Sequence, residues 1–372
     1  MNSNKPLSQE NRLLIFDFVR VIAIVMMLQG HAISSLTIPN QISGGLWEVW
    51  AFLRKLTAPT FLFVSGAVHV FANRRDINGI VPTKTLIKRL RMSVLLFFTA
   101  YILVFPAKRL IDLLYVKHDS WTYFFQPNIL QLFAVLMILL VILLKFTRTT
   151  SQFGRISFLF ALFIIIISPF TEKINWFSFL PEFIAPYFST ARGAYFPIFP
   201  WVAYFFFGSA FGALISRLKS DDRIYAIKRI GFIFGIILLI PGIYLSFHFN
   251  EEVLMRLSLV LIIISFFSYF VDLFKNSITW LQKFAKYSLF IYTLQILLLY
   301  GSSWYPSIGR LYEYSLSWQV SLSAAIILII SCFSAVYYLD KMFVNYPNSK
   351  KRFKQILYLI ISILMIFGLF EF

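Results

Sequence analysis

Long hydrophobic runs separated by short polar connections fill the chain. A helix needs about 20 apolar residues to cross the hydrocarbon core of a bilayer, and about eleven runs reach or approach that length. The runs cover residues 13–34, 47–72, 87–107, 128–146, 155–170, 195–216, 228–248, 253–273, 285–303, 317–339 and 353–370. The pattern predicts an all-α fold: a polytopic integral membrane helix bundle of about eleven transmembrane helices. Ten is the alternative count, because the run at 155–170 is short.

The connections between the runs are too short to form a separate soluble domain. We therefore expect a single transmembrane domain over residues 1–372, beginning with a short cytoplasmic segment at 1–12. A cleaved signal peptide is not expected, because the first run contains Asp17 and Arg20 and no small-residue cleavage pattern follows it.

Basic residues are concentrated in every second connection. For example, Arg74 and Arg75 follow the second run, and Arg217 and Lys219 follow the sixth. Most of the 34 Lys and Arg residues fall in this set of connections, so the positive-inside rule places the N-terminus in the cytoplasm and the C-terminus outside. The same distribution accounts for the net charge of +18, and nucleic acid is therefore not an expected partner.

Composition excludes a soluble protein and offers no metal motif. Hydrophobic residues make up 59% of the chain and charged residues only 13%, which is typical of membrane proteins. Cys332 is the only cysteine, which rules out a disulfide framework within the chain and a cysteine-based metal site. No His-x-x-x-His pair and no acidic cluster suggests a metal, so we expect none.

The first run contains two ionisable residues on one helical stripe. Arg20 and His31 are eleven residues apart, so on a helix their directions differ by about 20° and they lie roughly 16 Å apart along the axis. Ionisable groups inside a bilayer are costly and therefore often functional. His31 is either a general acid or base or a histidine wetted at the outer interface. Arg20 either forms a structural pair with Asp17 or binds an anionic ligand from the cytoplasm.

The second and third runs add further charged candidates. Glu48 and Arg54 are expected at the level of His31, where Arg54 can hold a carboxylate or stabilise an oxyanion. The alternative is that Arg54 and Lys55 extend to the surface. The segment Lys88–Arg91 begins the third run with three cations, which is either a phosphate site or an ordinary cytoplasmic helix end.

Four motifs together resemble those of the transmembrane acyltransferase superfamily, whose large bacterial branch is the acyltransferase-3 family. In chain order they are Arg20 with His31, Phe61-Leu62-Phe63-Val64-Ser65-Gly66, Lys88-Arg89-Leu90-Arg91, and Tyr287-Ser288 with Tyr292 and Gln295. The match to the family pattern is incomplete: Lys88 replaces an arginine, and Gln295 stands where a histidine is usual. The role of that late histidine therefore does not carry over.

A second branch of the superfamily, similar to heparan-alpha-glucosaminide N-acetyltransferase, fits as well. Its members tend to open a helix with Pro-x-x-Pro-Trp, which is similar to Pro197-Ile198-Phe199-Pro200-Trp201 here. Eleven hydrophobic runs also suit this branch better than the ten of the first branch. The motifs leave the choice between the two branches open.

The resemblance implies a membrane O- or N-acyltransferase that moves an acetyl group from cytoplasmic acetyl-CoA to a sugar or amine acceptor at the outer face. It implies that His31 is the general base or the acyl carrier and that Arg20, Lys88, Arg89 and Arg91 bind CoA. Four residues are the candidates for binding the acceptor: Arg54, Glu48, Ser65 and Gln295.

The expected location of the protein is the bacterial inner membrane. The alternative is a transporter or flippase of an anionic or lipid-linked solute; the oligomeric state is not predicted.

Overall fold

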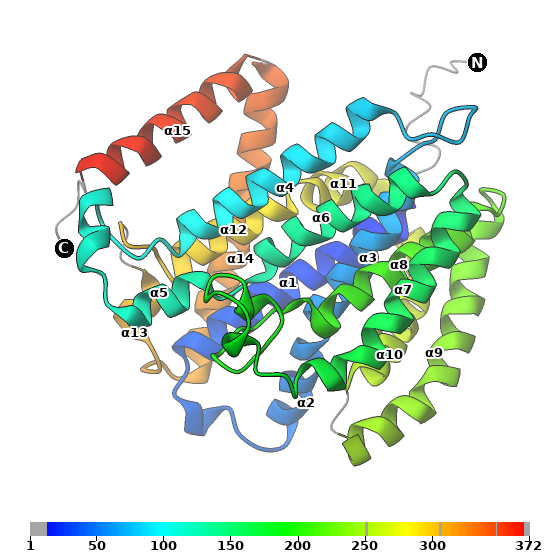
Figure 1. Ribbon diagram of the computed structural model, residues 1–372, viewed down its shortest axis with the longest axis horizontal. Coiled ribbons are helices and arrows are strands. Elements are labelled where there is room, and N and C mark those ends of the chain that lie inside the picture. Colours follow the sequence, from blue (N-terminus) through cyan, green and yellow to red (C-terminus); the bar gives the residue numbers. More distant parts are fainter. Residues whose placement is uncertain (1–12, 250–251, 305–306, 347, 368–372) are drawn as a thin grey trace. The chain divides into compact units, whose positions relative to one another are not determined.

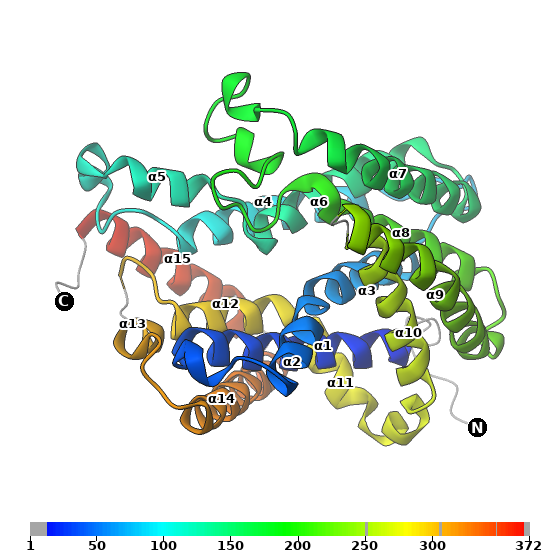
Figure 2. The same ribbon diagram turned by 90° about the horizontal axis from the view of Figure 1, so that it is seen from below.

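The fold is entirely helical wherever the computed structural model describes it, which is over residues 13–249, 252–304, 307–346 and 348–367 (Figure 1). Within these ranges there is no β-strand (Figure 2), and an isolated bridge pairs Thr37 with Leu316. The predicted all-α fold class is therefore confirmed. The predicted cytoplasmic segment 1–12 lies outside the described residues.

Each predicted hydrophobic run coincides with one helix or with two consecutive helices. These helices are α1 (Leu14–Leu36), α2 (Leu46–Lys55), α3 (Thr57–Ala72), α4 (Thr83–Leu103), α6 (Ile129–Phe146), α7 (Thr150–Thr171), α8 (Ile198–Ser216), α9 (Asp222–Phe249), α10 (Val253–Ser268), α12 (Ser288–Leu299), α14 (Trp318–Asn345) and α15 (Ser349–Phe367). Shorter helices lie in the connections: α5 (His118–Phe125), α11 (Ile278–Lys286), α13 (Ile308–Tyr312), and the 3-10 turns η1 (Pro39–Gln41), η2 (Leu110–Tyr115), η3 (Trp176–Ser178), η4 (Ala185–Tyr187) and η5 (Val271–Ser277).

The run at 47–72 differs from the prediction because it forms two helices, α2 and α3. Pro59 has no amide hydrogen, so the carbonyl of Lys55 cannot receive the hydrogen bond that would continue the helix. The regular pattern resumes one residue later, where the Thr60 amide donates to the Leu56 carbonyl over 3.0 Å.

Seven helical stretches in the described ranges are long and apolar enough to cross a membrane. They are Leu14–Leu36, Leu46–Ala72, Ile129–Phe146, Thr150–Thr171, Ile198–Ser216, Asp222–Phe247 and Trp318–Asn345. The short run at 155–170 is among them because α7 begins at Thr150, five residues earlier than the hydrophobic pattern indicated. The chain is therefore a multi-pass membrane protein, whereas the count of eleven crossings stays a prediction.

The chain folds into two compact units. The first comprises residues up to Ala23 with Lys55–Phe97 and Gln126–Leu281, and the second comprises Ile24–Arg54, Phe98–Phe125 and residues from Gln282 onward. Helix α1 contributes its N-terminal part to the first unit and its C-terminal part to the second. The prediction of a single domain over residues 1–372 stays a prediction.

Helices of the first unit touch through glycines. A Cβ atom on Gly66 of α3 would lie 1.9 Å from the carbonyl oxygen of Phe205 on α8, and one on Gly208 would lie 1.9 Å from that of Phe63. These distances are far below van der Waals contact, so only glycine allows the two backbones to approach this closely. The α3–α8 contact therefore fixes the position of Ser65, which precedes Gly66.

In the second unit, backbone contacts hold the segment after α1 against the segment that precedes α14. The Ile38 amide donates to the Leu316 carbonyl over 3.0 Å, and the Leu316 amide donates to the Leu36 carbonyl over 2.9 Å. The Trp318 amide, at the start of α14, donates to the side-chain oxygen of Gln41 over 2.9 Å. These bonds give the C-terminal end of α1 a fixed neighbour.

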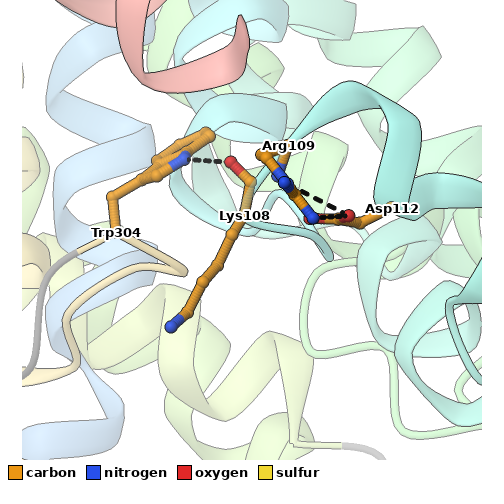
Figure 3. Close-up of polar contacts among 4 residues, drawn as sticks. All are labelled: Lys108, Arg109, Asp112 and Trp304. Atoms are coloured by element: carbon orange, nitrogen blue, oxygen red, sulfur yellow. Dashed lines mark hydrogen bonds and ion pairs between the residues drawn. The ribbon is translucent and has the colours of Figure 1, made fainter. Parts of the chain in front are cut away.

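The segment after α12 is attached to the segment after α4 (Figure 3). The indole of Trp304 stacks on Phe105 with 5.5 Å between ring centroids and 10° between planes. The same indole donates from Nε1 to the Lys108 carbonyl over 2.7 Å, and beside it the Arg109 guanidinium pairs with Asp112 at 2.9 Å. These contacts anchor the polypeptide just beyond α12, the helix that contains Gln295.

Candidate active site

Helix α1 contains both ionisable candidates of the first hydrophobic run. It runs without interruption from Leu14 to Leu36, so the helical stripe predicted for Arg20 and His31 is present. Arg20 belongs to the first unit and His31 to the second. Each residue lies in a polar cluster of its own unit, and the two clusters are described separately below.

The imidazole of His31 lies against the amide of Gln295. The Gln295 Nε2 atom is 2.5 Å from His31 Nδ1, and the Gln295 side chain is fully buried on α12. The amide oxygen of Gln295 is also buried, and it has no hydrogen-bond partner within the described part of the chain. The ring of Tyr300 stands edge-on to the imidazole with 5.9 Å between centroids. Gln295 and Tyr300 are therefore both neighbours of the imidazole.

Arg54, on α2, reaches the backbone beside His31. Its Nη1 donates to the Gly30 carbonyl over 3.0 Å, and its guanidinium lies 5.3 Å from the centre of the Trp50 ring. A Cβ atom at Gly30 would lie 2.6 Å from Cδ of Arg54, so the glycine leaves room for the arginine. Its positive charge also interacts electrostatically with His31. Arg54 is therefore a neighbour of the imidazole and not only a residue that extends to the surface.

The polar residues around His31 mostly hydrogen-bond to one another or to the helix. Trp50 Nε1 donates to Gln29 Oε1 over 3.0 Å, which ties α2 to α1. The hydroxyls of Ser34 and Ser35 donate to the carbonyls of Gly30 and His31, over 2.7 and 2.8 Å. These two serine hydroxyls therefore donate to the backbone of their own helix.

In the first unit, Arg20 contacts the second-run motif. Its Nη2 donates to the Ser65 hydroxyl over 3.3 Å, and its guanidinium lies 5.7 Å from the centre of the Phe61 ring. Ser65 is only 4% exposed. Two motifs that were identified separately in the sequence, 45 residues apart, thus form one contact.

Arg89 is the inward-facing member of the basic segment on α4. Its Nε donates to Oδ1 of Asn73 over 3.0 Å, and Asn73 is 6% exposed at the end of α3. The charges of Arg89 and Arg20 both interact with His69, one turn before Asn73. Asn73 Nδ2 and His69 Nδ1 are buried, and neither has a hydrogen-bond partner among the residues described. The inner cluster, defined here as Arg20, Ser65, His69, Asn73 and Arg89, is thus rich in groups that can bind an anion.

The remaining predicted site residues are at the surface of their units. Lys88 and Arg91 are exposed on α4, and Glu48 is exposed on α2. The structure therefore brings His31 together with Gln295 and Arg54, and Arg20 together with Ser65. The predicted roles of all these residues in binding or catalysis stay predictions.

His69 and Asn73 were not identified as site residues from the sequence. A signal was present, because Ser65, His69 and Asn73 recur every four residues and so share one face of α3. The pattern was not recognised because the residues between these three positions are mostly apolar, so the segment was interpreted only as a hydrophobic run.

The proline motif at the start of α8 lines a hollow of about 330 Å³ in the first unit. Its walls include aromatic rings, carboxylates and one arginine: Tyr195, Trp201, Tyr204, Glu172, Glu252 and Arg256. Arg256 forms an ion pair with Glu252. Rings together with carboxylates are suited to binding a polar ligand that also has apolar faces.

Comparison with protein families gives a match over more than half of the chain. The family model described as "Heparan-alpha-glucosaminide N-acetyltransferase, catalytic" matches residues 12–247. No curated protein and no solved structure matches the chain. The matched range includes His31, the inner cluster and the proline motif, and it decides between the two branches that the motifs left open. The chain belongs to the heparan-alpha-glucosaminide N-acetyltransferase catalytic family, a family of membrane acetyltransferases.

Proposed function

We propose that this protein transfers an acetyl group from acetyl-CoA, supplied by the cytoplasm, to a sugar amine or hydroxyl at the outer face of a bacterial inner membrane. Membership of the family supports acetyl transfer. The observation that supports the residue assignment is the contact between His31 and Gln295, a partly buried imidazole held at one nitrogen by a neutral, fully buried amide.

His31 is proposed as the general base. Rotating the Gln295 amide by 180° exchanges its oxygen and nitrogen, so that Oε1 accepts a proton from Nδ1–H of the imidazole. Nε2 is then unprotonated and accepts the proton of the acceptor amine or hydroxyl. The acceptor nitrogen or oxygen attacks the thioester carbonyl, the C–S bond breaks, and the CoA thiolate leaves with the proton that Nε2 had accepted, which restores the base. In the alternative, Nε2 itself attacks the thioester and passes the acetyl group on.

The inner cluster is proposed to bind the phosphates of CoA. Arg20 and Arg89 offer positive charge, and the buried amide nitrogen of Asn73, which has no hydrogen-bond partner among the described residues, can donate to a phosphate oxygen. The exposed side chains of Lys88 and Arg91 add charge at the start of the same helix, where the predicted topology places the cytoplasm.

Acceptor binding is proposed for Arg54, Glu48 and Gln295, with the hollow at the start of α8 as a further candidate. Ser65, also expected to bind the acceptor, contacts Arg20 and is assigned to the inner cluster instead. Arg54 is suited to stabilising the oxyanion that forms on the thioester, because it lies beside His31 and has a guanidinium to donate. Glu172 and Glu252 in the hollow are suited to an amino group, and Trp201 to a sugar ring. These assignments make an amino sugar the first acceptor class to test.

The test is acetyl transfer by the purified full-length protein in proteoliposomes. Labelled acetyl-CoA is supplied on one side together with glucosamine, neutral sugars or simple amines, and transfer of label is measured. We expect binding of acetyl-CoA and acceptor-dependent transfer. A transporter of an anionic solute would neither bind acetyl-CoA nor acetylate an acceptor, and that outcome would overturn the proposal. The family match favours the enzyme over the transporter.

A further inference from the structure

A second, larger hollow in the first unit is lined almost entirely by hydrocarbon. It has a volume of about 640 Å³, within the range of about 300–1,000 Å³ typical of ligand sites. Its walls come from α7, α8, α9 and α10, with Phe63 from α3. Representative lining residues are Phe158, Leu162, Leu214, Phe234 and Leu257.

The hollow lies where two closely packed helix pairs meet. In one pair, a Cβ atom on Gly154 of α7 would lie 2.6 Å from the Cβ of Ala213 on α8. In the other pair, one on Gly235 of α9 would lie 2.6 Å from Cγ1 of Ile262 on α10. Close packing inside each pair leaves the space between the pairs unfilled, and Leu162 is 38% exposed there.

Two arginines line one end of this hollow. Arg155 lies near the start of α7, and Arg217 directly follows the last residue of α8. Arg223 holds this helix end by donating to the carbonyls of Leu218 and Ser216, over 3.1 and 3.3 Å. Arg155 and Arg217 are both exposed, and neither has an ion-pair partner in the ranges that the structure describes. By the positive-inside rule this is the cytoplasmic end.

We propose that this hollow binds an anionic phospholipid of the cytoplasmic leaflet, with the headgroup phosphate between Arg155 and Arg217 and an acyl chain along the apolar walls. The charge of the two arginines is complementary to a phosphodiester and is placed at headgroup depth. At roughly 30 Å³ for each water-sized group, the volume accommodates on the order of 20 methylenes, about one acyl chain. The proposal does not depend on acetyl transfer.

The test measures lipid binding to the delipidated full-length protein in a neutral detergent. Dioleoylphosphatidylglycerol and dioleoylphosphatidylcholine are titrated separately, and bound lipid is counted by native mass spectrometry. We expect the anionic lipid to bind more tightly. Replacing both arginines, R155Q with R217Q, should weaken that binding by about thirtyfold. The matched control, K84Q with K145Q, removes the same charge from exposed positions outside the hollow and should leave binding unchanged.

A third variant separates the hollow from the charge. Leu162→Trp places an indole in the hollow and retains both arginines, so it should reduce binding of the anionic lipid without affecting thermal unfolding in detergent alone. Equal binding of the two lipids by the native protein would overturn the proposal. So would unchanged binding of phosphatidylglycerol in the double arginine variant.

Discussion

The two polar clusters on α1 differ in their chemistry. The cluster around Arg20 contains two guanidinium groups, and its buried Asn73 has an amide nitrogen without an acceptor in the described part of the chain. The cluster around His31 places an imidazole against a neutral amide, with one arginine directed to a backbone carbonyl. The first is suited to holding negative charge and the second to moving one proton. The comparison therefore predicts that mutations in the two clusters have separable effects on binding and on rate.

The largest effect is expected at His31. In His31→Ala no group accepts the proton of the acceptor, so kcat should fall by about a thousandfold while acetyl-CoA binding is retained. Steady-state kinetics and equilibrium binding in detergent measure the two quantities. His118→Ala, an exposed histidine of the second unit, is the matched control. Full activity of His31→Ala would refute the assignment of the base.

Mutations in the inner cluster should weaken acetyl-CoA binding and leave the rate at saturation nearly unchanged. Replacing Arg20 and Arg89 together by Gln removes two charged donors, so the Kd for acetyl-CoA should rise by about a hundredfold. At saturating acetyl-CoA the rate should stay close to that of the native protein. Lys84→Gln with Lys145→Gln is the control for the loss of two positive charges. An unchanged Kd in the double arginine variant would place the phosphate site elsewhere.

Gln295 sharpens the assignment within the His31 cluster. Gln295→Leu removes the amide that orients the imidazole, and kcat should fall by about tenfold while the KM for acetyl-CoA stays constant. Gln295→His restores a hydrogen-bonding partner and should recover part of the rate, with a pH–rate profile changed by the second imidazole. If Gln295→His and Gln295→Leu had equal rates over the whole pH range, Gln295 would not act through hydrogen bonding to His31.

The smallest effect concerns the exposed loop that follows α4. A hydrogen bond from Arg109 lowers the pKa of Asp112 below its ordinary value of 3.8, so this carboxylate stabilises the folded state above that pH. The contribution is lost as the pH falls through the lowered pKa. Thermal unfolding should therefore show Asp112→Asn slightly less stable than the native protein at pH 7 and equal to it once the pH is below the lowered pKa of Asp112. A difference that persists at the lower pH would contradict the ion-pair explanation.

The sequence predicted the helices better than it predicted their ends and their partners. The length of each hydrophobic run was enough to locate a helix. The break between α2 and α3, however, depends on the amide hydrogen that Pro59 lacks. The start of α7 consists of polar residues, which a hydrophobic pattern does not include. Arg20 and His31 were identified because charge inside an apolar run is conspicuous. His69 and Asn73 were missed because their contacts involve α4, and no local pattern indicates which helix is the neighbour.

Gln295 is a second residue whose partner could not be predicted from the sequence. As a sequence feature it was only a departure from a family pattern, on a short helix 264 residues from His31. Its significance lies in a contact that depends on how α12 packs in the second unit. Residue type can suggest chemistry, but only packing decides which two side chains share a proton.

The glycine contact between α3 and α8 has a consequence for how this part of the first unit can move. Two backbones that meet at Gly66 and Gly208 cannot slide or roll past each other without a steric collision, so α3 and α8 form a rigid pair. Ser65 therefore has a fixed position on this rigid pair, and so does its hydrogen bond with Arg20. If acetyl-CoA enters as proposed, the opening must come from movement of the helices around this rigid pair.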